Sequence, residues 1–358
     1  MCVIIYTKIN GKQFLIKNRD RTYNPKIEVI QEIVDGIEVV YIHDLTTGWR
    51  EGMNELGVGL VNSSLSRADD DNKSIFQRVK KNPKYLQTRE GKRKIKGEVN
   101  YEIITDKHFK NKIDNCFLHE SCYNMTSGHT LLLIDGTPYH VEKYKNNKEK
   151  EVDFFLNKLD SNKNIVITNN GIHGNGGLKG HSFVSSSIRR EIVQYEMKHN
   201  KIHNIDDLMK IINTYYVNID PRFHPYRDGY LSKRYINVKG SKYVSTTGQL
   251  VLNMTDKVFD YYSDIHHTSS VIYINKLPKD YTPKIQVNIH NTQKNMDRKK
   301  KVFTDLYLKN LYKKLDYNKH LKSKTRNNRS HKKSFTRKNN KHTLKTKSTK
   351  YTRKHKIY

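Results

Sequence analysis

Cysteine is scarce in this sequence. The 358 residues contain three, Cys2, Cys116 and Cys122. An odd and sparse set does not form a disulfide framework, so the sequence favours a reducing compartment. Cys116 and Cys122 also lack the second pair that a zinc-binding cysteine pattern needs. We expect these two thiols to be buried or idle, which leaves Cys2 as the candidate for chemistry.

Long apolar runs are missing as well. No segment approaches the roughly 18 consecutive apolar residues of a membrane-spanning helix, and no basic region followed by an apolar run begins the chain. We therefore expect no membrane span and no signal peptide, and an intracellular, cytoplasmic protein. Lys, Asn, Ile and Tyr are abundant, which is typical of an AT-rich genome. If that genome is a giant virus, the compartment would be the virion or the host cytoplasm.

Motifs for metals, phosphates and serine nucleophiles are not present. There is no His-x-x-x-His with a glutamate, and Gly174-Asn175-Gly176-Gly177 is not followed by Gly-Lys-Ser/Thr. No Gly-x-Ser-x-Gly surrounds Ser185-Ser186-Ser187, which reads as a helix cap. We expect neither a cofactor nor a metal ion.

Acidic residues are absent from the last forty positions. Residues 319–358 contain sixteen Lys and Arg and no Asp or Glu, within a chain whose formal net charge is +31. So polar a run cannot bury enough apolar surface to become ordered, and we predict a disordered tail. Such a tail can neutralise phosphates non-specifically, so nucleic acid or another polyanion is a candidate partner. The alternative is a solubilising tail without a partner.

The first seven residues carry the clearest chemical signal. A Met before a residue as small as Cys is normally removed, so we expect Cys2 to carry a free α-amine, with no further processing. That amine, with a reference pKa of about 7.7–8.0, can act as the base for its own thiol, whose reference pKa is about 8.5. The alternative is that Cys2 is an ordinary small apolar strand residue.

The next residues predict a hairpin. Residues 2–7 and 13–16 are strand-like, and Asn10-Gly11 between them is a strong two-residue turn signal. The hairpin would bring Asn18-Arg19-Asp20 to the start of the first strand. A guanidinium and a carboxylate would then lie near the thiol.

The rest of the chain reads as short strands with few helices. Asp35-Gly36 and Asp135-Gly136 predict two more hairpins, whereas residues 48–55 read as a loop. Helices are predicted over about 188–198 and over 206–216, the second capped by Asn204. Hairpins without βαβ spacing indicate an α+β domain of antiparallel strands over residues 2–290. An amphipathic helical linker over 291–318 and the tail would follow. The other predicted strands are 27–34, 37–45, 58–62, 131–134, 139–142, 165–168, 243–252, 257–263, 271–275 and 284–289.

Six short motifs occur in the order of a known family. They are Cys2, Asn18-Arg19-Asp20, residues 52–57 (Gly-Met-Asn-Glu-Leu-Gly), Asn62, Thr168-Asn169-Asn170, and the glycine- and serine-rich stretch 177–190. With these motifs the chain resembles the N-terminal-nucleophile (Ntn) hydrolases that use a cysteine. The family is that of choloylglycine hydrolase, penicillin V acylase and the acyl-CoA:6-aminopenicillanic acid acyltransferase-like proteins. The resemblance spans residues 2–190.

The resemblance implies a fold and a reaction. The fold is a four-layer αββα sandwich of two antiparallel sheets, and the reaction is cleavage or acyl transfer at a linear, non-peptide amide C–N bond. Cys2 would be the nucleophile, with its α-amine as general base. Asp20 would orient the amine, and Asn18 and Arg19 would support the site.

The remaining implied site residues lie later in the chain. Asn62 and Asn169 correspond to the polar groups at the oxyanion and amine positions, and Arg190, or the neighbouring Arg189, corresponds to a structural arginine. Elementary chemistry agrees with such roles, because cations near a thiol favour its thiolate and preorganised amide donors stabilise an oxyanion.

The motif at residues 18–20 leaves the subfamily open. The bile-salt hydrolase branch has an arginine followed by an asparagine. Asn18-Arg19-Asp20 is instead similar to the Asn-Arg-Asp signature of the transport-and-Golgi-organisation-like proteins, in which a Glu follows where this chain has Arg21. The acyl group therefore stays open. A second class of function also remains, an inactive hydrolase-fold scaffold whose basic tail binds nucleic acid or another polyanion.

Overall fold

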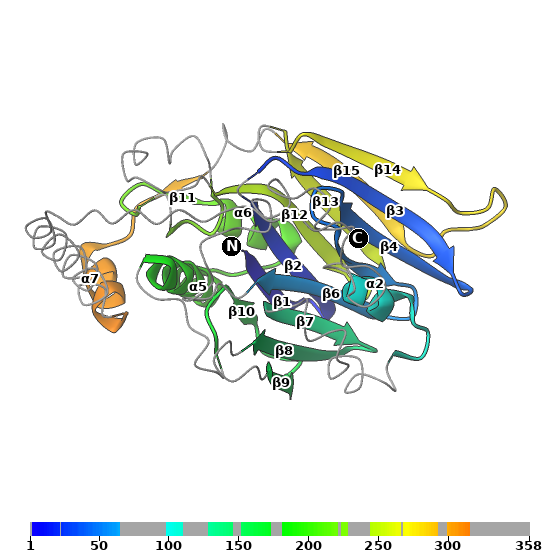
Figure 1. Ribbon diagram of the computed structural model, residues 1–358. Coiled ribbons are helices and arrows are strands. Elements are labelled where there is room, and N and C mark those ends of the chain that lie inside the picture. The colour runs from blue at the N-terminus through cyan, green and yellow to red at the C-terminus, as the bar shows by residue number, and fades with distance from the viewer. Residues whose placement is uncertain are drawn as a thin grey trace, which may run out of the picture.

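The computed structural model describes most of the chain between residues 2 and 315 (Figure 1). The described ranges are 2–21, 23–64, 98–109, 128–145, 152–172, 181–220, 223–227, 244–265, 268–292 and 299–315. The expectations for Cys116, Cys122, the glycine loop at 174–180 and the tail at 319–358 lie outside these residues.

One sheet has six strands and contains the N-terminal hairpin at its middle. Its strands, in spatial order, are β10 (Ile165–Ile167), β1 (Val3–Ile9), β2 (Lys12–Arg21), β12 (Ser245–Asn253), β13 (Val258–Asp264) and β15 (Gln286–Thr292). All neighbours are antiparallel except β13 and β15, which are parallel.

The other sheet has eight strands. Their order is β14 (Ser270–Asn275), β3 (Lys26–Val34), β4 (Ile37–Asp44), β5 (Trp49–Asn54), β6 (Val58–Ser64), β7 (Gly128–Ile134), β8 (Thr137–Lys145) and β9 (Val152–Lys158). Its edge strand β14 runs parallel to β3. The prediction of antiparallel sheets is thus correct except at one edge of each, because the chain crosses from β13 to the second sheet at β14 and returns to the first at β15.

Three predicted hairpin turns are confirmed. Asn10 and Gly11, between β1 and β2, have φ of 48° and 81°. Asp35-Gly36 and Asp135-Gly136 have the same pair of positive φ angles. A two-residue turn of this kind needs both central residues in the left-handed region, which Asn, Asp and Gly tolerate best. These dipeptides therefore set the registers of β1–β2, β3–β4 and β7–β8 locally.

The two sheets pack face to face. Between them lies an apolar core in which Ile4 and Leu15 of the six-stranded sheet meet Val29, Met53 and Leu131 of the eight-stranded sheet. Each such side chain contributes about 1.5–3 kcal/mol on burial. This layer is the centre of the molecule.

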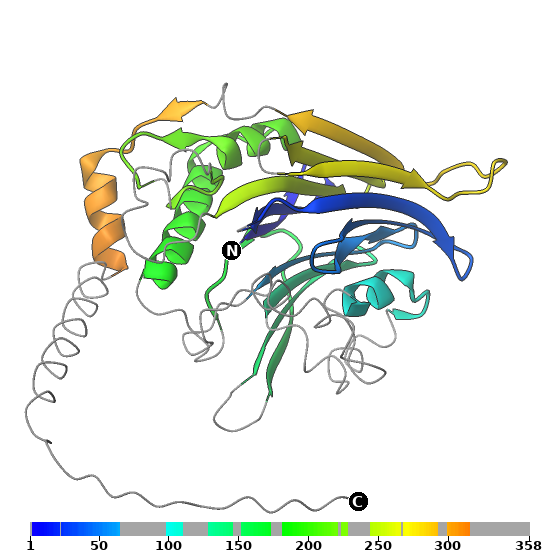
Figure 2. The same cartoon turned by 45° about the horizontal axis from the view of Figure 1, so that its top comes forward.

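Helices cover the outer faces of both sheets (Figure 2). Helix α2 (Glu98–Thr105) packs Ile103 and Ile104 on the eight-stranded sheet. Helices α5 (His181–His199) and α6 (Ile205–Asn213) lie on the six-stranded sheet, with Val193 and Leu208 in the same apolar cluster as Ile5. The predicted αββα sandwich is confirmed.

Three of the local predictions differ from the structure. Residues 48–55, predicted as a loop, contain strand β5. A Cβ atom at position 52 would lie only 2.0 Å from the backbone of the neighbouring strand β4, so Gly52 fits there because it has no side chain. Helix α5 begins at His181 rather than near Ile188, so Ser185-Ser186-Ser187 lie inside the helix instead of capping it. Helix α6 is capped by Asn204 as predicted but ends at Asn213, since β11 (Tyr215–Tyr216) follows.

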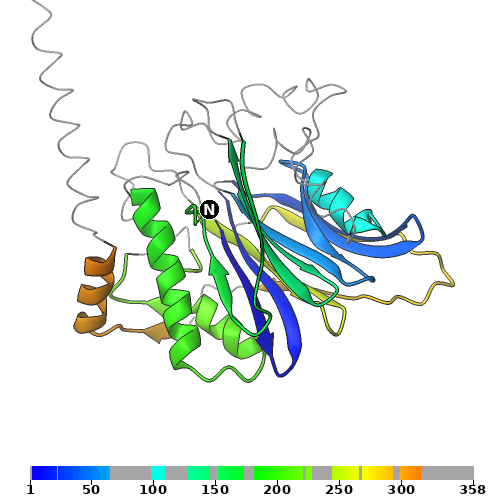
Figure 3. The ribbon, with the colours of Figure 1, turned by 90° about the horizontal axis from the view of Figure 1, so that it is seen from below.

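The last described segment returns to helix α5 (Figure 3). Strand β16 (Lys300–Lys301) pairs with β11, and α7 (Asp305–Lys314) buries Leu311 in a cluster with Ile188 and Ile192 of α5. The predicted domain limits at 290 and 318 stay predictions. Among the described helices, none has the length and apolar character needed to cross a membrane.

Candidate active site

Cys2 lies immediately before β1, opposite the residues that follow β10. Its side chain is 2% exposed. Because β10 pairs with β1 so that Ile4 faces Ile167, the antiparallel register brings Asn169 to Cys2. The nitrogen of Cys2 donates a hydrogen bond of 2.9 Å to Oδ1 of Asn169. With Met1 attached this atom is a peptide nitrogen, and after removal of Met1 the same atom would be the α-amine.

Asn169 is itself held from three sides. Its side-chain amide donates to Oγ of Ser63 at 3.0 Å, and its backbone N–H donates to Oγ of Ser186 at 2.8 Å. Nη2 of Arg189 donates to its Oδ1 at 3.1 Å. With two donors on the oxygen and an acceptor at the nitrogen, the amide has one orientation, which aims Oδ1 at Cys2.

Arg189 connects Cys2 to the predicted carboxylate. Its Nη1 lies 3.4 Å from the carbonyl oxygen of Cys2 and 3.5 Å from Oδ2 of Asp20. Arg190, the other arginine that the motif offered, is 29% exposed, and its acidic partner among the described residues is Glu191 at 4.0 Å. Consecutive helical residues point about 100° apart, so only one of the two can face the sheet. The structure places Arg189 there.

Asp20 reaches Cys2 through Arg189. Its Oδ1 accepts from Oγ1 of Thr246 at 2.8 Å, and its Oδ2 lies 3.6 Å from Nε of Arg227. A fully buried carboxylate between two guanidinium groups accepts charge-assisted contacts from both and fixes their positions. Asp20 therefore lies in the cluster around Cys2 and is connected through Arg189 to the carbonyl oxygen of Cys2 and to Asn169.

Asn18 and Arg19 point to opposite faces of β2, as successive strand residues do. Asn18 faces the helical layer, where it donates to the carbonyl of Pro225 at 3.1 Å and accepts from Gln249 at 2.7 Å. Arg19 faces the sandwich interior and pairs with Asp44 at 3.2 Å. Neither contact is to Cys2, so both residues support the site from a distance.

The guanidinium next to the thiol belongs to Arg21. Its Nη1 is 3.5 Å from Sγ of Cys2, and its Nε is 3.7 Å from Asp44. On the same face of β2, Lys17 forms a buried ion pair with Glu51 of β5. Glu51 also accepts from the indole N–H of Trp49. These residues were not among those predicted. Side chains of a strand alternate between its faces, so Lys17 and Arg21 could have been predicted to lie on the same face of β2 as Arg19.

The positive charges make the thiol acidic. Burial alone raises the pKa of Cys2. In the chain that still carries Met1, the positive charges of Lys17, the amino group of residue 1 and Arg21 outweigh burial and lower the pKa from 9.0 to about 7. The carboxylate of Asp20 raises the pKa again by a smaller amount. About half of such a thiol is thiolate at neutral pH, and the thiolate is the nucleophilic form.

Asn62 points away from Cys2. On β6, Val61 packs in the core between the sheets whereas Leu60 packs beneath α2, so Asn62 belongs to the outer face. Its side-chain amide donates to Oγ1 of Thr130 on the neighbouring strand at 3.0 Å. Ser63, one residue later, faces inward and contacts Asn169. The position expected for Asn62 is thus taken by Ser63, because a shift of one residue reverses the face of a strand.

A separate group could hold a metal ion. Among the described residues, His129, His140 and Glu142 place a ring nitrogen or carboxylate oxygen each within 4.8 Å of one another, all buried.

Comparisons with known proteins give a limited result. No protein-family model matches the chain, and no curated protein matches it. Among solved structures, a penicillin V acylase from Agrobacterium tumefaciens is similar over 74% of this chain and 86% of its own, with 10% sequence identity and a TM-score of 0.33. A likeness of this size carries no argument about function. The sandwich of two sheets between helices is a property of this chain's own strands and helices.

Proposed function

We propose that the chain is a cysteine amide hydrolase or acyltransferase in which Cys2, after removal of Met1, attacks a linear, non-peptide amide. The observation that carries the proposal is the hydrogen bond from the Cys2 nitrogen to Asn169. It supports an α-amine held in a fixed place beside its own thiol, which is what a self-activating N-terminal nucleophile needs. The order of motifs that resembles the Ntn hydrolases supports the same reaction.

The reaction would proceed in two steps, formation of a thioester to Cys2 and cleavage of that thioester. The α-amine accepts the thiol proton, and the thiolate sulfur attacks the amide carbonyl carbon. As the tetrahedral intermediate collapses, the C–N bond breaks, the leaving amine takes the proton from the α-ammonium, and a thioester to Cys2 remains. Water then cleaves the thioester in hydrolysis, or a second amine cleaves it in acyl transfer.

The surrounding charges have distinct roles in this scheme. Lys17 and Arg21 favour the thiolate, which lowers the cost of forming the nucleophile. Asn169, held by Ser63 and Arg189, keeps the nitrogen lone pair near the thiol once Met1 is gone. Asp20 fixes Arg189 in turn, so it acts as a positioning residue.

Selective labelling of Cys2 is the first test. The purified chain should have the mass without Met1, and a thiol electrophile should add rapidly to one site. The labelling rate should rise with pH and reach half of its maximum well below pH 9, because Lys17 and Arg21 lower the thiol pKa and only the thiolate reacts. The measurement is intact-mass spectrometry over a pH series.

Two controls make the labelling result specific. In Cys2→Ala the fast label should disappear, leaving any slow reaction of Cys116 and Cys122. A chain that retains Met1, or that labels with a midpoint near pH 9, would contradict the proposed nucleophile. A positive result justifies a panel of linear amides, penicillin V among them.

The competing function concerns the tail. The sixteen Lys and Arg of residues 319–358 support binding to nucleic acid or another polyanion. We expect the full chain to bind duplex DNA of any sequence, with an affinity that falls about 10³- to 10⁵-fold between 50 and 200 mM salt if 6–10 phosphates are contacted. Removal of residues 319–358 should abolish this binding and leave Cys2 labelling unchanged, as measured by fluorescence anisotropy and mass spectrometry.

If either of these two expected results is not observed, the outcome distinguishes the two functions. Binding that survives the truncation would assign the polyanion surface to the body of the protein. An unreactive Cys2 together with tail-dependent DNA binding would favour the scaffold function.

A further inference from the structure

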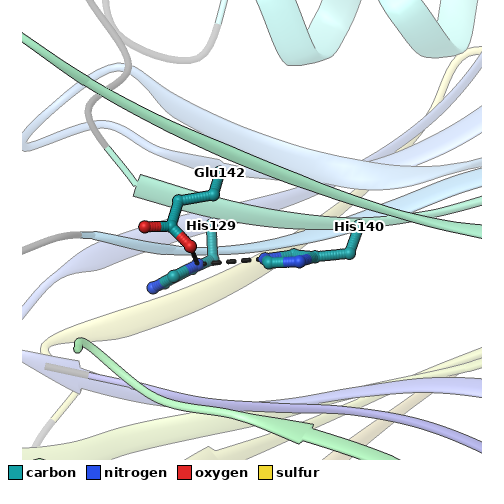
Figure 4. Close-up of side chains that lie close together, drawn as sticks. All are labelled: His129, His140 and Glu142. Carbon is teal, nitrogen blue, oxygen red and sulfur yellow. Dashed lines mark hydrogen bonds and ion pairs between the residues drawn. The ribbon is translucent and has the colours of Figure 1, made fainter. Parts of the chain in front are cut away.

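Two neighbouring strands bring two histidines and a glutamate together inside the sandwich (Figure 4). His129 lies on β7, and His140 and Glu142 lie two residues apart on β8. In the β7–β8 register His129 is directly opposite Glu142, and His140 is opposite Leu131. Leu131 belongs to the core between the sheets, so this face of both strands points inward. All three polar side chains are at most 3% exposed.

The atoms of these side chains that could bind a metal ion lie close together. Nδ1 of His129 is 3.0 Å from Nε2 of His140 and 3.9 Å from Oε2 of Glu142. Two ligands on a tetrahedral zinc ion, each about 2.0–2.1 Å from the metal, lie roughly 3.4 Å apart. The two distances from His129 lie on either side of this value, and the third pair, His140 and Glu142, lies within 4.8 Å, so side-chain adjustments would let all three atoms share one ion.

The outer contacts orient these ligands. Nε2 of His129 lies 2.7 Å from the backbone oxygen of Asn170. A carbonyl can only accept, so Nε2 carries the proton and Nδ1 presents its lone pair to the other two groups. Glu142 accepts at Oε2 from the backbone N–H of Ile172 at 2.8 Å. An N–H bound to a backbone carbonyl is the outer-shell arrangement typical of metal-binding histidines.

We propose that His129, His140 and Glu142 form a binding site for a divalent transition-metal ion of the zinc type. Two neutral imidazoles and a carboxylate suit such an ion, whereas Mg²⁺ and Ca²⁺ prefer oxygen ligands. The ion would take the place of the proton shared between the two rings.

The site has a structural consequence for the chain around it. It ties β7 to β8 and, through His129, holds the carbonyl of Asn170, the residue after Asn169. The ion would thus stabilise the segment that follows β10. The proposal does not depend on the reaction at Cys2, and its test reads metal content and stability instead of catalysis.

The test uses the full chain, stripped with a chelator and dialysed. Titration with Zn²⁺ should show one tight site by calorimetry and a rise in melting temperature, and Co²⁺ should give the visible absorption of a tetrahedral complex. His140→Gln and Glu142→Gln should each weaken the tight site by more than the roughly 10- to 100-fold that loss of an outer-shell partner costs. Both replacements keep a polar group of similar length, so the hydrogen bonds to His129 and Ile172 can remain.

A matched control excludes general histidine binding. His290 forms a half-exposed pair with Asp260 at 3.0 Å, and His290→Gln should leave the tight site unchanged. Equal Zn²⁺ stoichiometry and affinity in the native chain and Glu142→Gln would overturn the proposal, as would the absence of a tight site in the native chain. If His140→Gln does not fold, the native titration and Glu142→Gln still decide the question.

Discussion

Replacing Cys2 by Ala is expected to lower the rate of amide cleavage by roughly 10⁴- to 10⁶-fold, the range known for loss of a nucleophile. The reason is that Ala keeps the strand start and the Asn169 contact but removes the sulfur that would form the thioester. The measurement is kcat/KM of the native chain and the variant on an amide found by the substrate panel. Because Ala is as small as Cys, Met1 should still be removed, and the α-amine is retained.

The control is Cys2→Ser, which keeps a nucleophilic atom. Its hydroxyl has a much higher pKa than the thiol, so Lys17 and Arg21 cannot ionise it to a useful extent. We expect activity between that of the native chain and Cys2→Ala, with melting temperatures close to native. Full activity in Cys2→Ala would show that the hydrolysis has another source and would end the proposed mechanism.

Replacing Arg189 by Met is expected to lower the free energy of unfolding by about 3–5 kcal/mol, the usual cost of removing one partner from a buried ion pair. Arg189 is fully buried and contacts Asp20, Asn169 and the Cys2 carbonyl. Its loss leaves the Asp20 carboxylate with Arg227 as its remaining guanidinium partner among those described. Urea unfolding, followed through the single Trp49, gives the value by linear extrapolation.

Arg190→Met is the matched control for this result. The same substitution one position later on α5 removes a partly exposed side chain whose acidic partner among the described residues, Glu191, is 4.0 Å away. It should change the free energy of unfolding by no more than about 0.5 kcal/mol, as surface substitutions usually do. Equal effects of the two variants would contradict the assignment of the structural arginine to Arg189.

Much of the fold followed from local sequence. Asn10-Gly11, Asp35-Gly36 and Asp135-Gly136 each predicted a hairpin, because a turn with two positive φ angles restricts residue type within the turn itself. Asn204 predicted the start of α6 for a similar reason, since its side chain caps a backbone N–H three residues away. Alternation of apolar residues and the absence of βαβ spacing were enough to indicate the α+β class.

The sequence by itself determined that Cys2 stands at the start of a hairpin and that the end of the second strand returns Asp20 to its vicinity. Only the tertiary structure decided which neighbours face Cys2. Ser63 lies where Asn62 was expected, and Arg21 lies where Arg19 was expected. Of the two arginines that the motif offered, Arg189 and not Arg190 faces the site. The physical reason is that adjacent residues on a strand or helix point in different directions, so a motif locates a site to within a residue but not to a face. The juxtaposition of His129, His140 and Glu142 is instead local, because the Asp135-Gly136 turn sets the β7–β8 register. Only the tertiary structure decided that this face of the hairpin points into the core.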